Sequence, residues 1–211
     1  MGVSLSKKES EFLIRFIVES DAIEGVQADP KLVSKQLEQR QTDGHVGAIL
    51  LLDSLAKNKQ PLTPEIIQQV QGLITAEQHT KPGGEELEPE NIGQYRLGWV
   101  KIGGRICPSP QEVPALMEAW LSQVNAWQKN GNSSFEKKLG QIAKLHWDYE
   151  FIHPFADGNG RSGRAIVYYL MLYGGLKPFI FTADNRFATY YPAFRSPKDM
   201  QWYFRYKYLN S

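Results

Sequence analysis

The segment from His153 to Arg164 concentrates the residue types that a nucleotide-phosphate site requires. It reads HPFADGNGRSGR and holds an imidazole, a carboxylate, a turn flanked by glycines and two guanidinium groups. His153, with an ordinary pKa of about 6.5, can accept a proton from an attacking hydroxyl group at neutral pH. Asp157 is a natural ligand for Mg²⁺, which takes one or two carboxylates and completes its shell with phosphate and water. The segment therefore predicts a site for a nucleotide and its metal ion.

The backbone of this segment is expected to form an anion-binding turn followed by a helix. Pro154 biases His153 away from helical conformations, so a preceding helix must end close to it. Gly158 and Gly160 lack a Cβ, so the chain between them can take positive φ and approach a ligand closely. The helix expected from residue 161 to 172 directs the positive end of its dipole at the same point.

Arg161 and Arg164 lie three positions apart and therefore share one face of the first turn of that helix. There their planar guanidinium groups can each hold phosphate oxygens with two hydrogen bonds. Cations at a helix N-terminus oppose the dipole, so a partner anion, either a ligand or a carboxylate, is expected beside them. The alternative is a glycine-rich connection with a buried histidine and two solvated arginines. This alternative does not explain why so many reactive side chains occur together in one short segment.

The segment resembles the signature HPFx[D/E]GNGRxxR of the Fic family, whose members most often transfer AMP from ATP to a protein hydroxyl group. The resemblance implies that His153 is the general base and that Asp157 holds Mg²⁺, for which Mn²⁺ can substitute. A target Ser, Thr or Tyr hydroxyl would attack the α-phosphorus in line, and pyrophosphate would leave. Positioning and charge neutralisation would supply most of the rate.

The resemblance also implies how the nucleotide is bound. The backbone of Gly158, Asn159 and Gly160, together with the Asn159 side chain, would form the anion hole for the α- and β-phosphates. Arg161 and Arg164 would contact the distal phosphates.

A second motif lies upstream, near the end of the first expected helix. Residues 20–25 read SDAIEG and resemble the family's inhibitory motif [S/T]xxxE[G/N]. The resemblance implies that Glu24 pairs with Arg164 and keeps the γ-phosphate from its productive position. Taken alone, the short pattern fits a solvated glutamate beside a glycine that ends a helix.

Residues 95–108 resemble the family's flap. Residues 99–102 and 105–107 are expected to form two short strands around a Gly-Gly turn. In the family this hairpin adds the target segment as an extra strand, which implies a target protein as partner. The alternative is an ordinary hairpin that lies against a helical body.

Tyr190 and Tyr191 resemble a tyrosine pair that lines the adenine pocket in some family members. Buried tyrosines that pack the last helices are the alternative. The polar residue that often follows such a pair has no clear counterpart, because Ser196 and Pro197 interrupt the helix. Purine selectivity is therefore left open.

The pattern of caps and apolar residues predicts a mainly α fold, a Fic-type helical domain with a small β-hairpin flap near the site. Helices are expected over residues 6–19, 31–40, 45–57, 63–76, 109–129, 135–151, 161–172 and 197–209. Residues 1–57 would supply N-terminal helices with the inhibitory motif, and residues 58–211 the core, in one compact unit.

Composition favours a soluble cytoplasmic protein. The net charge of +1 provides no field to attract nucleic acid, and no apolar stretch approaches the roughly 20 residues of a membrane span. Cys107 is the single cysteine, so no internal disulfide forms. His146 is expected to pack within a helix, and His45 and His79 to lie at the surface or at helix ends. A homo-oligomer is possible.

Three functions compete at this stage. The leading one is an autoinhibited, Mg²⁺-dependent adenylyltransferase that acts on protein hydroxyl groups. The second is related chemistry with another nucleotide-linked donor, or removal of AMP with Glu24 placing a water molecule. The third is a binding module whose site is silent, against which the intact His153, Asp157 and both arginines argue.

Overall fold

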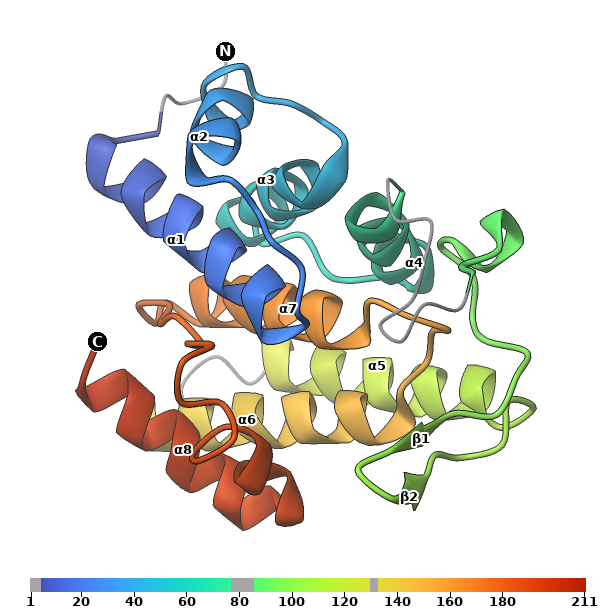
Figure 1. Cartoon of the computed structure of the whole chain (residues 1–211). Helices are drawn as coiled ribbons and strands as arrows, with labels where there is room; N and C mark the ends of the chain where they lie inside the picture. Colours follow the sequence, from blue (N-terminus) through green and yellow to red (C-terminus); the bar gives the residue numbers. More distant parts are fainter. Residues whose placement is uncertain (1–4, 77–85, 130–132) are drawn as a thin grey trace.

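The computed structural model describes residues 5–76, 86–129 and 133–211 as a helical body with one small hairpin (Figure 1). The helices are α1 (Lys7–Ile23), α2 (Pro30–Glu38), α3 (Gly44–Lys57), α4 (Pro64–Thr75), α5 (Val113–Lys129), α6 (Phe135–Ile152), α7 (Asn159–Tyr173) and α8 (Pro197–Leu209). The strands are β1 (Lys101–Ile102) and β2 (Arg105–Ile106), which pair antiparallel. Two 3-10 turns, η1 (Pro89–Asn91) and η2 (Tyr191–Arg195), complete the described elements. The mainly α fold with a hairpin is confirmed. His79 lies outside the described residues.

Helix α7 runs through the middle of the molecule, with α1, α3, α4 and α6 packed around it (Figure 1). Its apolar run, residues 165–171, is buried on every side, as expected for a helix without a polar face. Two phenol groups in this run satisfy their polar atoms inside the core. Tyr168 donates to the Asp53 carboxylate at 2.7 Å, and Tyr169 donates to the Gln60 carbonyl at 2.6 Å.

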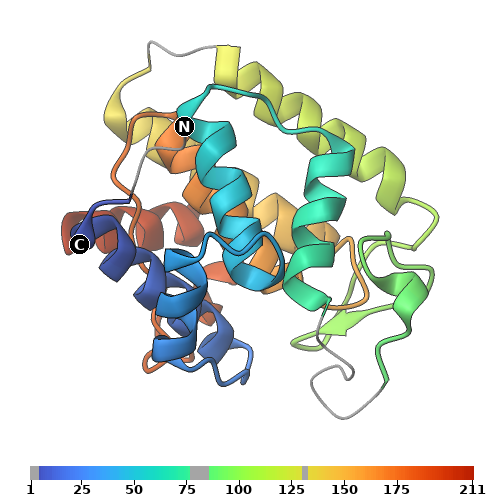
Figure 2. The same ribbon diagram turned by 90° about the horizontal axis from the view of Figure 1, so that it is seen from above.

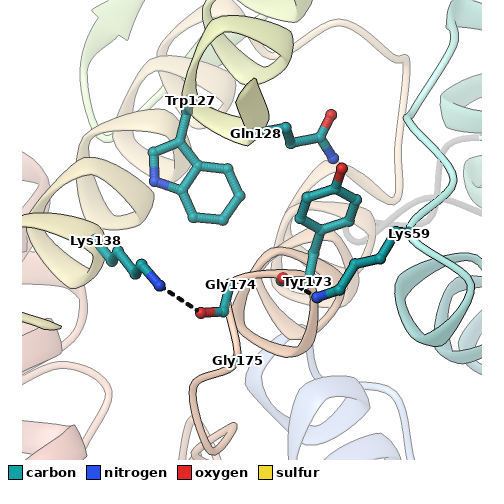
Figure 3. Close-up of a pocket in the computed structure, with 7 residues that line it drawn as sticks. All are labelled: Lys59, Trp127, Gln128, Lys138, Tyr173, Gly174 and Gly175. Carbon is teal, nitrogen blue, oxygen red and sulfur yellow. Dashed lines mark hydrogen bonds between the residues drawn. The ribbon is translucent and has the colours of Figure 1, made fainter. Parts of the chain in front are cut away.

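The C-terminal end of α7 is held by two lysines from other parts of the chain (Figure 3). Lys59 donates to the carbonyl of Tyr173, and Lys138 donates to the carbonyl of Gly174 at 3.1 Å. Cations at this end match the negative pole of the helix dipole. Gly175, at φ +72°, then turns the chain away and ends the helix. The helix that carries the signature is therefore anchored at the end remote from the hairpin.

Helix α1 begins where the sequence predicts and ends one turn later than predicted. Ser6 and Glu9 form the expected capping box, with reciprocal bonds of 2.8 and 3.2 Å. The helix continues to Ile23, and Gly25, at φ +78°, terminates it. Bonds from the Gly25 and Val26 N–H groups to carbonyls of the last turn close a Schellman motif. This ending fixes Glu24, which lies between Ile23 and Gly25, at the helix terminus.

Helix α5 begins at Val113, four residues after the predicted start. The predicted start at residue 109 was wrong. Ser109 and Glu112 instead close a turn, in which the Ser109 N–H donates to the Glu112 carboxylate at 2.8 Å. Pro114 explains the actual start, because proline is tolerated only in the first turn of a helix.

The hairpin lies at the opposite end of the molecule from the C-terminus (Figures 1 and 2). Its base is tied to the end of α6 by Arg96, which is only 1% exposed. The Arg96 guanidinium donates to the carbonyls of His153 at 2.7 Å and Ile152 at 3.3 Å. It also donates to the carbonyls of Gly98 and Pro108, which closes the base of the flap.

Arg105, in β2, completes the same set of contacts. It donates to the carbonyls of Phe151 at 3.2 Å and Glu150 at 3.5 Å, and its guanidinium lies over the Phe151 ring at 4.2 Å. The last carbonyls of a helix have no partner within it, and α6 has no basic residue in its own last turn. The flap arginines therefore supply the C-terminal capping of α6.

Replacing Arg96 with Met preserves the aliphatic stem and removes the donors. We expect the free energy of unfolding to fall by about 3 kcal/mol or more, because several buried carbonyl groups lose their partner. Urea denaturation measures the loss. Arg105→Met is the matched control and should cost about 1 kcal/mol, since its side chain is more exposed and its bonds are longer. Equal losses in the two variants would contradict this account of α6 capping.

Candidate active site

A cleft of about 700 Å³ opens between the flap, the end of α6, the start of α7 and the η2 segment. Its lining includes these residues predicted from the sequence: Glu24, His153, Gly160, Arg164, Tyr190 and Tyr191. Its lining also includes Ile102, Gly103 and Arg105 of the predicted flap, together with residues that sequence reasoning missed: Trp147, Glu150, Phe151, Phe194 and Arg195. Asp157, Gly158, Asn159 and Arg161 belong to the loop and first turn next to this lining.

His153 ends α6 in the left-handed conformation, at φ +51°. Its Nδ1 atom is buried and has no partner in good hydrogen-bond geometry among the described residues, although the Glu150 main-chain carbonyl acts on the ring, so Nε2 is the nitrogen left to face the cleft. Burial lowers the pKa of His153 to about 3, and the Arg96 and Arg105 guanidinium groups add to the shift. The expectation of an unshifted pKa was therefore wrong, but the imidazole is neutral at pH 7 and its Nε2 can accept a proton.

The loop after His153 is closed by the side chain of Asn159. Its Oδ1 accepts from the Phe155 N–H at 2.8 Å, and its Nδ2 donates to the Phe155 carbonyl at 2.9 Å. Both ends of the amide are thus engaged with the backbone, and Asn159 is 2% exposed. The side chain therefore shapes the turn and leaves the backbone for the anion hole, and its contact with the phosphates stays a prediction.

The two glycines of the turn have different reasons to be glycine. Gly158 is at φ +74°, and an added Cβ would meet Thr75 Cγ2 at 2.7 Å. Gly160 is helical, contrary to the expectation of positive φ, and its added Cβ would lie 2.2 Å from Glu24 Oε1. Gly158 therefore serves the turn, and Gly160 serves the close approach of an anion to the start of α7.

Asp157 in this turn and Arg161 in the first turn of α7 have 3.5 Å between their closest charged atoms. The described residues contain no group of three or more His, Cys, Asp or Glu side chains able to hold a metal. A single carboxylate beside an anion-binding turn nevertheless fits Mg²⁺, because this ion completes its shell with substrate phosphates and water.

Arg164 is surrounded by acceptors from α1. Its guanidinium lies 2.9 Å from Glu24 Oε1, and it donates to the Ser20 hydroxyl at 3.0 Å and the Ser20 carbonyl at 2.8 Å. Arg164 is 1% exposed, whereas the Glu24 side chain is 28% exposed at the cleft. The partner anion expected beside the signature arginines is therefore supplied by the upstream motif, as the sequence predicts.

The two tyrosines of the predicted pair occupy different environments. Tyr190 is 1% exposed, and its hydroxyl lies 2.8 Å from Nε2 of the buried His146, so it is mainly a packing residue. Tyr191 is 38% exposed, and its hydroxyl donates to the Ile23 carbonyl at 3.2 Å. Tyr191 is the member of the pair with surface available in the cleft.

An aromatic wall beside Tyr191 was missed. Trp147 and Phe151 stack on one face of α6 with ring centroids 5.1 Å apart, and Phe194 adjoins them. The spacing of four residues between Trp147 and Phe151 is a signal that could have identified this wall. Its rings offer a planar base the surface on which to stack.

Two further polar residues were missed or misplaced. Glu150 is buried in the cleft, and burial raises its pKa to about 8, with Glu24 adding to the shift and Arg164 opposing it. His45 lies at the start of α3 as expected, but it is not a surface group: its Nδ1 pairs with Asp21 at 2.9 Å, and both side chains are buried. His146 packs within α6, as predicted.

Adding a methyl group at position 160 tests the contact with Glu24. Gly160→Ala should push the Glu24 carboxylate off Arg164 and cost about 1–3 kcal/mol of stability. In the Glu24→Gly background the same change should cost less, because the added methyl group then meets only the Arg164 guanidinium group, at 3.0 Å, and alanine favours a helix. A double-mutant cycle measured by urea denaturation gives the coupling. Additive effects would show that Glu24 does not lie against Gly160.

The two buried histidines predict a loss of stability in acid. His146 and His153 both have a pKa of about 3, below the ordinary value, so their contribution is full above about pH 6.5 and falls as the pH drops toward 3. Glu150, with a raised pKa of about 8, acts in the opposite direction and offsets one of them between pH 6 and 5. The free energy of unfolding should therefore fall by about 1.4 kcal/mol per pH unit in that range.

Glu150→Gln should roughly double that slope, because both histidines then act without an offset. Urea denaturation at closely spaced pH values measures the slope in both proteins. A slope that is flat in the unsubstituted protein, or unchanged by the substitution, would contradict the assigned protonation states.

No helix in the described ranges has both the length and the apolar character needed to cross a bilayer.

Among curated proteins, the chain is 29% identical over 198 residues to protein adenylyltransferase Fic of Culex quinquefasciatus, covering 90% of this chain and 38% of that protein. It is 30% identical over 105 residues to the Drosophila melanogaster protein of the same name, covering 50% of this chain and 20% of that protein. The chain thus spans well under half the length of these relatives.

Solved structures share the fold. A Fic domain containing signaling protein from Bacteroides thetaiotaomicron aligns with a TM-score of 0.73 at 20% identity, covering 93% of this chain and 82% of that one. Fic-1 from C. elegans aligns with a TM-score of 0.68 at 18% identity, covering 95% of this chain and 61% of that one. The Fic/DOC family model matches residues 61–171, which is more than half of the sequence, and on this ground the chain belongs to the Fic/DOC family.

Proposed function

We propose that this protein transfers AMP from ATP to a Ser, Thr or Tyr hydroxyl group of a protein, itself included, and that Glu24 restrains this activity. The names of the curated relatives support the reaction class. The cleft supports it chemically, because it combines a neutral imidazole, an anion-binding helix terminus and a buried guanidinium group. The observation that carries the restraint is the 2.9 Å contact between Glu24 and Arg164.

In the proposed reaction, His153 Nε2 accepts the proton of the attacking hydroxyl group as its oxygen bonds to the α-phosphorus. The leaving pyrophosphate departs in line. The backbone N–H groups at the start of α7 stabilise the charge on the α- and β-phosphates, and Arg161 and Arg164 hold the distal phosphates. Asp157 would hold Mg²⁺, which neutralises phosphate charge when bound.

The flap is proposed to hold the target protein. Ile102, Gly103 and Arg105 border the same cleft as His153. Four apolar side chains of the flap segment are exposed, namely Leu97 at 86%, Trp99 at 67%, Ile106 at 66% and Ile102 at 37%. An extended target segment could add to the two-stranded hairpin and cover these side chains, which would place its hydroxyl group beside the imidazole.

The restraint is proposed to work by competition for one cation. Arg164 has to lose Glu24 before its guanidinium can hold a phosphate, because the carboxylate occupies the space above Gly160. The Tyr191 hydroxyl donates to the Ile23 carbonyl at the end of α1, a contact that does not involve the Glu24 side chain. Removal of the Glu24 side chain would thus vacate the phosphate position while the end of α1 keeps this contact.

Glu24→Gly should raise AMP transfer at least about tenfold, because the distal phosphate gains a buried cation. Its cost in stability should be about 1–3 kcal/mol, below the value for a fully buried pair, since the Glu24 side chain is partly exposed. The protein and its variant are incubated with Mg²⁺ or Mn²⁺ and with ATP labelled at either the α- or the γ-phosphate. Protein-bound label is then counted.

Label retained only from the α-phosphate, and abolished by His153→Ala, is the expected result. Retention from the γ-phosphate would identify phosphorylation and overturn the proposal. No increase in label on any protein after Glu24→Gly, the protein itself included, would refute the restraint.

A further inference from the structure

Glu150 is a buried carboxyl group in the cleft for which the reaction above has no use. It lies in the last turn of α6, three residues before His153, and its side chain is 10% exposed. It borders the cleft together with His153 and Arg164. A buried carboxyl group is costly unless it is paired or neutral, so its place at the reaction centre requires an explanation.

The Glu150 carboxyl group and the His153 imidazole approach each other at this point, and each has one buried polar atom without a hydrogen-bond partner among the described residues. Glu150 Oε2 lies 3.7 Å from His153 Nδ1, which is too far for a hydrogen bond. Neither His153 Nδ1 nor Glu150 Oε1 has a hydrogen-bond partner among the described residues. Buried polar atoms are rarely left without a hydrogen-bond partner. A small rotation of either side chain would bring His153 Nδ1 and the Glu150 carboxyl group within hydrogen-bond distance.

The space around the carboxyl group is shaped for it. A Cβ added to Gly163 in α7 would lie 2.3 Å from Glu150 Oε1. Gly163 therefore leaves room for the Glu150 side chain at the helix interface, just as Gly160 leaves room for Glu24 one turn earlier.

We propose that Glu150 is a positioning residue for His153, an inference that rests on the proposed AMP transfer. When Glu24 no longer contacts Arg164, the Glu150 carboxylate accepts a hydrogen bond from Nδ1–H. This bond fixes the tautomer in which Nε2 carries a lone pair. When Nε2 takes the proton of the attacking hydroxyl group, the imidazolium that forms is stabilised by the neighbouring carboxylate. The proton moves only from oxygen to Nε2, and Nδ1 keeps its own.

The proposal also links the base to the restraint. With Glu24 in place, the raised pKa of Glu150 keeps its carboxyl group protonated at pH 7. Removal of Glu24 takes away a like charge and leaves Arg164 unneutralised beside Glu150, and both changes lower the pKa of Glu150. The carboxylate then forms when the phosphate position opens.

Other groups around this pair act on its titration. They are Arg96, Arg105 and Cys107 from the flap segment, Tyr149 from α6 and Tyr190 from the η2 segment. All of them are retained in the comparison below, so their effects cancel between variants.

The first test follows His153 directly. The chain has four histidines, so labelled-histidine NMR resolves them, and His153→Ala assigns the signal. In the nucleotide-free Glu24→Gly protein, the pKa of His153 should be at least about one unit higher than in the Glu24→Gly, Glu150→Gln double variant. Equal values would overturn the proposal and would indicate that Nδ1 is held by the Glu150 main-chain carbonyl instead.

The second test uses the pH profile of AMP transfer in the Glu24→Gly background. Glu150→Gln should lower kcat about 10- to 100-fold, leave KM for ATP unchanged, and move the acid limb of the profile to lower pH. Glu150→Asp retains the charge and should return the limb toward its original position. Asp148→Asn, a carboxylate on the same helix that pairs with Lys144, is the control and should change neither quantity.

A loss of rate without movement of the acid limb would reduce Glu150 to a packing residue and refute the proposal, as would an unaltered kcat. If the Glu24→Gly protein transfers no AMP at all, the proposed function fails. The histidine titration still decides the contact between Glu150 and His153 in that case, because it requires no turnover.

Discussion

Helix α6 has to end at His153, because Pro154 cannot continue it, and the carbonyl groups of its last turn then need donors from elsewhere. Arg96 and Arg105 of the flap segment provide them. One set of hydrogen bonds therefore fixes the flap, the end of the helix and the left-handed backbone conformation of His153. The same guanidinium groups disfavour a positive imidazole, so the capping of a helix also favours the neutral form that the proposed general base requires.

The second constraint is the charge of Arg164, which is buried at the positive end of α7 and always requires an anion. In the resting protein the anion is Glu24, reinforced by the Ser20 hydroxyl and carbonyl. A bound phosphate would satisfy the same requirement. The contact that stabilises the buried guanidinium group is thus the same contact to which the proposed restraint is assigned, and a bound ligand would compensate the guanidinium group when the glutamate leaves.

Features that depend on local sequence were predictable. Capping residues and prolines gave the bounds of α8 and the start of α1, and the spacing of the signature put Arg161 and Arg164 on one turn. The pairing of Glu24 with Arg164 required the family resemblance, since no local rule joins residues so far apart.

What sequence reasoning missed depends on tertiary packing. The inward side chain of Asn159, the lowered pKa of His153 and the burial of Glu150 arise only when α6, α7 and the flap come together. The absence of a side chain at Gly160 also limits which substitutions can be accepted during evolution. Any larger residue there would crowd Arg164 as well as Glu24, so α7 offers no change that frees the cation and keeps the pocket open. Under the proposed restraint, a lineage with unrestrained transfer would have to change Glu24 or the end of α1 that holds it, and such descendants should be sought by their substitutions there.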